Sequence, residues 1–405
     1  MTSLVPVLTA ATGQPWEAGL VARSGDAEVG VAVVARCLDV VDLLATAHAG
    51  RARVAVLAAD LRHLDRETVA RLHELGLSVV LVGSPRRLQE VGVDAVVDEE
   101  APPELIGRAV AEALAPARPT LETAGPCGQL VAVWGPTGAP GRSTVALALA
   151  DEAAAAGVRT VLVDADAYGG SIATQLGLLD EAPGLAAAVR AAATGMLDPP
   201  ALLACCCAIE ASPLAVLTGI TRADRWPELR DAAFAAVLEA ARHAADLVVV
   251  DVGFCLEADE EITYDLPAPR RNGATLTALS AADTVVAVAA ADPLGLQRFV
   301  RGLPDLRARL RADARVSIVV NKVRDGAVGG RDAAAQITAA LERHAMTRPD
   351  ALLPHDLVAC DRSLARGSTL REVAQSSALR AGLRALAGEL AGAPVTSRRP
   401  RRRAR

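Results

Sequence analysis

The sequence predicts an α/β protein with two domains, each built on a parallel or mostly parallel sheet. Short apolar runs of strand length recur along the chain and alternate with helical segments, a pattern typical of parallel α/β folds. Residues 116–128 interrupt this alternation with a stretch rich in Pro, Gly and Thr, which we interpret as a linker. The chain has 405 residues, enough for two or three domains with substantial cores.

The first domain is expected at residues 1–115. Its apolar runs predict five strands that alternate with five helical patterns, which favours a (βα)5 arrangement around a parallel sheet. The expected strands are Leu4–Leu8, Val29–Val34, Val54–Ala58, Leu77–Val82 and Val93–Val97, with helices such as Asp65–Leu75 and Pro103–Leu114 between them.

That arrangement resembles a response-regulator receiver domain, with Asp60 near the position of the phosphorylated aspartate. A working receiver also needs an acidic pair after its first strand and a lysine after its fifth. Here the first strand ends in Thr9-Ala10, and the domain has no lysine. Because Asp60 lacks the Mg²⁺ ligands that phosphoryl transfer needs, we interpret the domain as a pseudo-receiver for protein contact or localisation. A phosphorylated receiver is the alternative.

The second domain, residues 129–392, opens with a motif that resembles a phosphate-binding P-loop. The apolar run Leu130–Trp134 reads as a buried strand, a loop of Gly, Pro and Thr follows, and Ser143 opens an Ala/Leu-rich helix. In a P-loop, backbone N–H groups of the loop and of the helix N-terminus converge on an anion. The usual pattern is G-x-x-x-x-G-K-[ST], and here Arg142 stands where the lysine belongs. An ordinary strand-to-helix turn is the alternative.

Polar side chains follow three further strands of this domain. Asp164 and Asp166 end the strand that begins at Thr160, Asp251 ends the next, and Asn321 ends another. Because the carboxyl ends of parallel strands meet at one edge of the sheet, these groups are expected to lie close to the loop. A P-loop and three carboxylates at one edge predict a Mg²⁺-nucleotide site.

These residues resemble the MinD/ParA family of P-loop ATPases, most closely its CpaE-like branch, which also carries a receiver domain at the N-terminus. The resemblance covers roughly residues 129–392. The family P-loop reads K-G-G-x-G-K-[ST]-[ST], so Thr137 stands at its signature lysine, Gly138 and Ala139 at its two glycines, and Arg142 at its second lysine. Lys322 is the only lysine in the chain. An arginine is not equivalent to a lysine at a phosphate, because the planar guanidinium is bulkier than the compact ammonium group.

The resemblance implies an ATP site with Mg²⁺ as its metal. It assigns nucleotide binding to Gly138, Ala139, Pro140, Gly141, Arg142, Ser143 and Thr144, with Asn321 as the adenine reader. It assigns the metal to Ser143, Asp251 and Asp164. Asp166 would orient the attacking water, with Asp164 and Arg142 as the other catalytic candidates.

Both family lysines are missing, so slow hydrolysis is expected unless another cation substitutes. A positioned cation on the transferring phosphate is worth about 10³- to 10⁵-fold in related enzymes. Arg142 is one candidate, and Arg270 or Arg271 is another, in cis or across a nucleotide-dependent homodimer. An ordinary solvated loop is the alternative for Arg270 and Arg271.

Composition favours a cytoplasmic protein, with a peripheral place at the inner face of the cell membrane as an option. No run of 18 apolar residues occurs, and Met1-Thr-Ser-Leu has no charged region before an apolar stretch, so neither a transmembrane helix nor a secretory signal is expected. The seven cysteines form no CxxC pair, and the triplet Cys205–Cys207 is interpreted as thiols in an apolar setting rather than a metal site.

The C-terminal region combines an apolar stripe with a basic tail. Leu379, Leu383, Leu386 and Leu390 lie on one face of an expected helix Ser377–Leu390, which we interpret as core packing, with membrane binding as the alternative. Residues 393–405 are expected to be disordered, and their six arginines without an acid suit contact with anionic lipid or nucleic acid. A basic helix at Pro293–Ala312 offers a second DNA or lipid face, or a solvated one.

Three functions follow as hypotheses. The first is a weak ATPase switch that dimerises on ATP and positions septum or pilus machinery. The second is a non-hydrolysing scaffold that binds nucleotide and presents the first domain to protein partners. The third is a ParA-like chromosome-partition protein that binds DNA.

Overall fold

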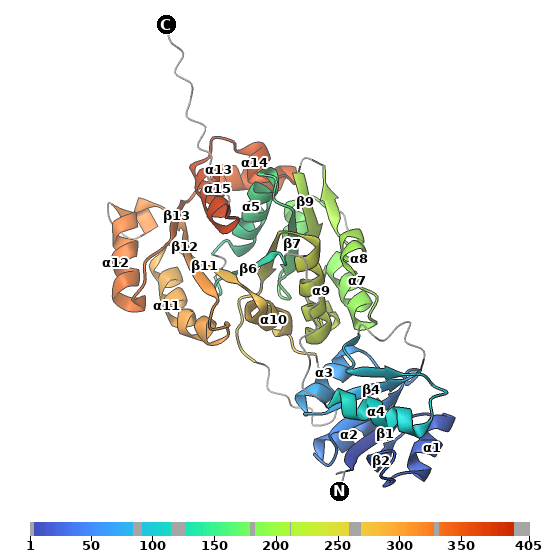
Figure 1. The fold of residues 1–405 in the computed structure, drawn as a ribbon. Coiled ribbons are helices and arrows are strands. Elements are labelled where there is room, and N and C mark those ends of the chain that lie inside the picture. Colours follow the sequence, from blue (N-terminus) through green and yellow to red (C-terminus); the bar gives the residue numbers. More distant parts are fainter. Residues whose placement is uncertain are drawn as a thin grey trace.

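The computed structural model describes residues 4–83, 91–114, 127–138, 140–178, 183–210, 212–258, 269–327 and 332–392. These residues form two α/β domains, with the N-terminal domain at one end of the molecule (Figure 1). The expected tail 393–405 and almost all of the expected linker lie outside the described residues.

The N-terminal domain is built on a parallel five-stranded sheet with the order β2-β1-β3-β4-β5. Its strands are β1 Val5–Ala10, β2 Val31–Cys37, β3 Val54–Ala58, β4 Ser78–Val82 and β5 Ala95–Val97. All five lie at the predicted places, with ends that differ by a few residues. The described helices are α1 Pro15–Ala22, α2 Val40–His48, α3 Arg66–Glu74 and α4 Pro103–Ala113.

Strand alternation divides the core of this domain into two layers. Val54 and Val56 face α1 and α4, whereas Ala55 and Leu57 face α2 and α3. Because β3 is central and covered on both sides, every one of its residues is buried, which explains its continuous apolar sequence.

The second domain is built on an eight-stranded sheet with the order β13-β12-β11-β6-β10-β7-β9-β8. The strands are β6 Gln129–Trp134, β7 Thr160–Ala165, β8 Cys207–Ile209, β9 Ser212–Leu217, β10 Leu247–Val252, β11 Thr284–Ala290, β12 Arg315–Val323 and β13 Ala351–Pro354. All pairings are parallel except that of the edge strand β8 with β9. The predicted α/β class with a mostly parallel sheet is therefore confirmed.

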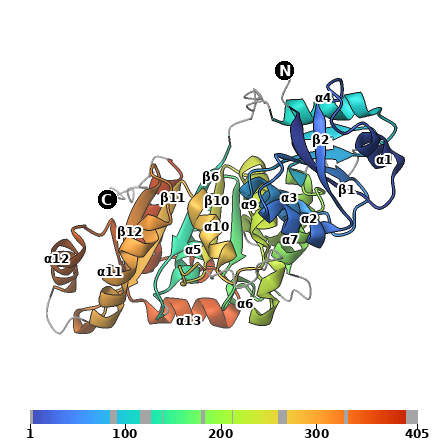
Figure 2. The same cartoon turned by 90° about the horizontal axis from the view of Figure 1, so that it is seen from below.

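Helices cover both faces of this sheet (Figures 1 and 2). One face carries α5 Arg142–Ala155, α13 Leu357–Arg366, α14 Leu370–Val373 and α15 Ala378–Leu390. The other carries α7 Gly184–Ala193, α8 Pro199–Ala204, α9 Asp231–Ala244, α10 Gly273–Ala281, α11 Pro293–Ala308 and α12 Ala333–Ala345. The short helix α6 Ile172–Gln175 follows β7, and 3₁₀ turns occupy Ala223–Glu228 and Asp325–Ala327.

The leucine stripe of the last helix packs into the core, as predicted. Its four leucines are buried, and α15 lies against α5. Two ion pairs fasten this region to α5: Arg371 to Asp151 at 3.0 Å and Arg380 to Glu152 at 2.5 Å. Since both acids are buried, the pairs also offset the desolvation of two carboxylates within the helix.

The cysteine triplet lies at the edge of the sheet, where Cys207 begins β8. All three side chains are partly buried thiols. Burial raises the pKa of Cys206 to about 12, which keeps that thiol protonated. No helix in the described parts of the chain is both long and apolar enough to cross a bilayer.

The two domains meet where α3 packs on α9 and α7. Arg230, just before α9, pairs with Asp65 at 2.6 Å, and the Glu67 carboxylate accepts the backbone N–H of Ala232 at 3.2 Å. Burial, together with the nearby Asp231 charge, raises the pKa of Glu67. This contact joins the first domain to the N-terminal end of α9.

Candidate functional site

The predicted P-loop connects the central strand β6 to α5, as the sequence indicates. Gly138 and Gly141 have φ values of +107° and +98°, which favour glycine. A Cβ on Gly141 would lie 2.4 Å from Nδ2 of Asn321, so the close approach also requires glycine. No side chain caps the first turn of α5, which leaves its N–H groups for an anion.

Three carboxylates gather at the carboxyl ends of β7 and β10. Asp164 and Asp251 are direct register partners across these strands, and Asp166 follows just after β7. Asp164 accepts the backbone N–H of Ile172 at 3.0 Å, and Asp166 accepts that of Tyr168 at 2.9 Å. All three side chains are buried, so the predicted convergence of carboxylates is present.

Among these three groups, Asp251 has the largest desolvation cost. It is 0% solvent-accessible, and neither carboxylate oxygen has a hydrogen-bond partner among the described residues. Burial raises its pKa well above the ordinary value, and the Asp164 charge adds to the rise, while the nearby Ser143 hydroxyl and the Arg142 guanidinium act against it. Burial likewise raises the pKa of Asp164. A buried carboxylate without a partner is costly unless a cation compensates it.

This donor set fits the implied Mg²⁺. Carboxylate and hydroxyl oxygens are the ligands that magnesium prefers, and Ser143 lies next to Asp251 at the start of α5. Ser143 and Asp251 would hold the ion, and Asp164, the third predicted ligand, is the register partner of Asp251 on β7.

The Arg142 side chain packs against the loop instead of extending into solvent. Its Nη1 donates to the carbonyl of Gly135 at 3.1 Å, and its Nη2 donates to Oδ2 of Asp166 at 3.2 Å. The side chain is only 12% exposed. The residue predicted to contact phosphate is thus tied to the residue predicted to orient water, a pairing that sequence reasoning missed.

Asn321 holds the loop from the side of β12. Its Nδ2 donates to the carbonyl of Pro140 at 2.8 Å, and the side chain is buried. Pro140 has no backbone N–H, so it shapes the loop rather than donating to an anion. Ala139, also predicted in the site, lies outside the described residues.

A cavity of about 470 Å³ opens beside this loop. Arg142, Ser143, Thr144, Asp166 and Asn321 line one part of it. The opposite wall comes from the end of β13 and from α13, and it includes Pro354, His355, Asp356, Leu357, Cys360 and Asp361. Sequence reasoning did not foresee this wall, because nothing in α13 itself carries a nucleotide motif.

Arg270 and Arg271 are engaged away from this cavity. Arg270 pairs with Asp231 on α9, and the Arg271 guanidinium lies 4.2 Å from the centre of the Tyr168 ring. Tyr168 in turn donates its hydroxyl to Asn272 at 2.8 Å. These contacts connect the segment after β7 with the segment before α10, but they place neither arginine on the cavity wall.

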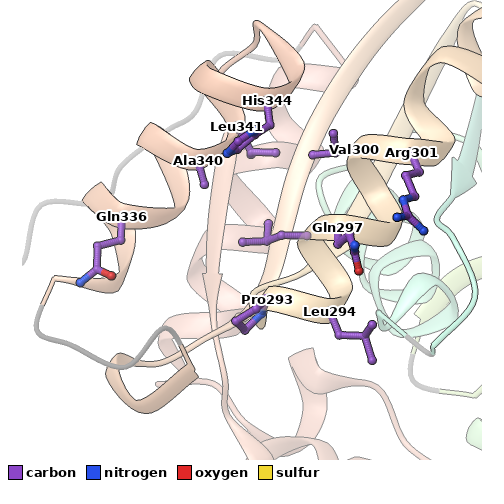
Figure 3. Close-up of a pocket in the computed structure, with 10 residues that line it drawn as sticks. Pro293, Leu294, Gln297, Val300, Arg301, Gln336, Ala340, Leu341 and His344 are labelled. Carbon is purple, nitrogen blue, oxygen red and sulfur yellow. The ribbon is translucent and has the colours of Figure 1, made fainter.

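A larger cavity of about 830 Å³ lies between α11 and α12 (Figure 3). It is lined mainly by apolar side chains, among them Leu294, Val300 and Leu341, with Arg301 and His344 at the same site. None of the P-loop residues or carboxylates described above lines it. Size alone therefore does not identify the functional site of this protein.

The carboxyl edge of the N-terminal sheet differs from this site in the exposure of its aspartate. Asp60, just after β3, is exposed, and its Oδ1 accepts Nε2 of Gln14 at 2.7 Å. Gln14 stands after the first strand, where a working receiver carries acids, so an amide supplies the partner of this aspartate.

Comparison with known proteins finds neither a matching family model nor a matching curated protein. Solved structures do match. A ParA family ATPase from Chlorobium tepidum aligns at a TM-score of 0.54 and 17% identity, covering 64% of this chain and 98% of that one. A variant of Cyanothece McdA in complex with ATP aligns at a TM-score of 0.51 and 15% identity, covering 67% of this chain and 98% of that one.

About two thirds of this chain shares the fold of these two proteins. A third similar structure, the cell-division ATPase MinD of Pyrococcus furiosus, aligns at a TM-score of 0.48 and 15% identity, covering 65% of this chain and 98% of that one. At identities this low the likeness concerns the fold, so any activity must be argued from the residues of the site.

Proposed function

We propose that this protein is a nucleotide-dependent switch that binds Mg²⁺-ATP and hydrolyses it slowly. The observation that carries the proposal is Asp251, a fully buried carboxylate with no partner among the described residues, beside Ser143 at the uncapped start of α5. A divalent cation held by Asp251 and Ser143 would offset the cost of burying this carboxylate.

The chain's own residues have distinct roles in this proposal. N–H groups of the loop and of the first turn of α5 would bind the phosphates, and Ser143, Asp251 and Asp164 would hold Mg²⁺. The bound metal supplies neutralisation of charge on the phosphates. Asn321 keeps the loop in place through the Pro140 carbonyl and lines the adjoining cavity.

Slow hydrolysis is expected from the residues that stand at the two lysine positions of the family P-loop. Thr137 is neutral, and Arg142 is bound to Asp166. While this pair persists, Asp166 is not free to orient a water, and the guanidinium is not free to neutralise phosphate. The same observation favours a second candidate, the non-hydrolysing scaffold that binds nucleotide without turnover.

In the cell, the switch would dimerise on ATP and position septum or pilus machinery, with the N-terminal domain as the protein-contact module. Residues 393–405 would add peripheral contact with anionic lipid. A DNA-binding partition role is the alternative for the basic tail, and it predicts a salt-sensitive shift of non-specific DNA only when ATP is present.

The test is thermal unfolding with Mg²⁺-ATP and with ATP plus EDTA, combined with phosphate release from the same samples. At about 100 times the dissociation constant, ligand should stabilise the fold by about 2.7 kcal/mol. Stabilisation that needs Mg²⁺, with slow release that Asp166→Ala abolishes, supports the switch. Stabilisation without release supports the scaffold. No stabilisation at millimolar ATP overturns both.

A further inference from the structure

The P-loop of this protein has a cationic neighbour that comes from a distant part of the chain. Arg298, on α11, directs its Nη1 to the carbonyl oxygen of Thr137 at 3.4 Å. Thr137 and Arg298 are 161 positions apart, so only the packing of α11 beside the loop brings them together. Thr137 also stands at the position of the signature lysine in the family that this chain resembles.

Gly138 shows how closely this guanidinium approaches the loop. A Cβ built on Gly138 would lie 2.3 Å from Nη1 of Arg298, closer than real Cβ atoms come to any neighbour. The φ of Gly138, +107°, independently favours glycine at this position. The absence of a side chain at Gly138 therefore leaves room for the Arg298 guanidinium beside the loop.

The position of Arg298 is well determined by the first turns of α11. Asp292 caps the helix by accepting the N–H of Gly295 at 2.9 Å, and Leu296 and Phe299 are buried on either side of Arg298 in the sequence. Arg298 has no ion-pair partner among the described residues, so none of their acids neutralises its charge. Its guanidinium has five N–H donors, of which the long contact with Thr137 uses one.

We propose that Arg298 contacts the β- or γ-phosphate of the bound nucleotide and replaces the cation that the loop lacks. The proposal rests on the proposed function and adds a residue to that site. Arg142 is tied to Asp166 and Thr137 is neutral, so Arg298 is the guanidinium at the loop whose only described partner is a carbonyl. A planar guanidinium suits phosphate oxygens, to which it binds in a bidentate manner.

The test compares Arg298→Ala with Arg301→Ala in the full-length protein. Arg301 lies one turn further along the same helix, is exposed, and is one of the residues that line the cavity between α11 and α12. Calorimetry with Mg²⁺-ATP and with Mg²⁺-tripolyphosphate should show binding weakened about tenfold or more by Arg298→Ala and less than about twofold by Arg301→Ala. Arg298→Lys should recover part of the loss.

Gly138→Ala provides a second readout. Its Cβ would displace the guanidinium, so combining it with Arg298→Ala should cost less than the sum of the two single changes. Far-ultraviolet circular dichroism of each variant without ligand checks that the fold is kept.

The outcomes separate this proposal from the proposed function. If the wild type binds both ligands and Arg298→Ala behaves like Arg301→Ala, the role of Arg298 is overturned and the nucleotide switch stands. If only tripolyphosphate binds and Arg298→Ala weakens it, the anion contact stands and the ATP function fails. If the wild type binds neither ligand, both proposals are overturned.

Discussion

The two sheets of this protein each have an aspartate at a carboxyl edge, but the surroundings of the two aspartates differ. Asp60 of the N-terminal domain is exposed and accepts a hydrogen bond from Gln14. Asp251 of the second domain is fully buried, and its oxygens have no partner in the described part of the chain. A solvated carboxylate with a partner costs little, whereas a buried carboxylate without one destabilises the fold until a cation binds. The comparison therefore locates the need for a ligand in the second domain.

The largest expected effect is that of Asp251→Asn. The variant should lose most of the stabilisation of about 2.7 kcal/mol that Mg²⁺-ATP gives the wild type at about 100 times its dissociation constant. Without ligand it should be no less stable than the wild type, because a neutral amide replaces a buried carboxyl group that has no partner among the described residues. Thermal unfolding with and without Mg²⁺-ATP measures both quantities.

Asp60→Asn is the matched control for this change, since it removes one charge at the corresponding edge of the other sheet. It should leave the ligand response intact and alter stability by less than about 0.5 kcal/mol. Equal responses of the two variants would mean that the contrast between the two edges has no functional meaning.

An intermediate effect is expected for Arg142→Lys, which tests whether the arginine restrains Asp166. A lysine cannot keep both the carbonyl contact with Gly135 and the contact with Asp166 that the forked guanidinium makes. Phosphate release should rise about tenfold, a decrease of about 1.4 kcal/mol in the barrier. Single-turnover phosphate release measures it, and a fall in the rate would show instead that Arg142 itself acts on phosphate.

The smallest effect on stability is expected for a change at Glu67, where the two domains meet. Burial raises the pKa of Glu67 above its ordinary value of 4.5, so the folded state binds more protons than the unfolded state above this pH. The free energy of unfolding of the wild type therefore falls as the pH rises through that range. Glu67→Gln keeps an acceptor for the Ala232 N–H and removes the titration.

Urea denaturation should show Glu67→Gln to be more stable than the wild type by up to about 1 kcal/mol at pH 7.5, with little difference near pH 4. Glu112→Gln, at an exposed position of α4, is the control and should show no such dependence on pH. A constant difference between wild type and Glu67→Gln at both pH values would contradict the burial argument.

Long central strands were predictable because their signal is local. β3, β6 and β10 are continuous apolar runs that are buried on both faces, and each was located within one or two residues. The short edge strands β8 and β13 were not predicted, since each has only a few residues and its sequence does not differ from a loop. The helices α12 and α13 were missed as well, although α13 forms a wall of the cavity beside the loop.

The sequence by itself determined the α/β class and the gathering of Asp164, Asp166 and Asp251. Strand patterns are local, and parallel strands necessarily bring their carboxyl ends to one edge. Only the tertiary structure decided what the cations of the site do. The contacts of Arg142 with Asp166 and of Arg298 with Thr137 join residues 24 and 161 positions apart. Such contacts depend on how helices pack beside the loop, and no local pattern in the chain encodes that packing.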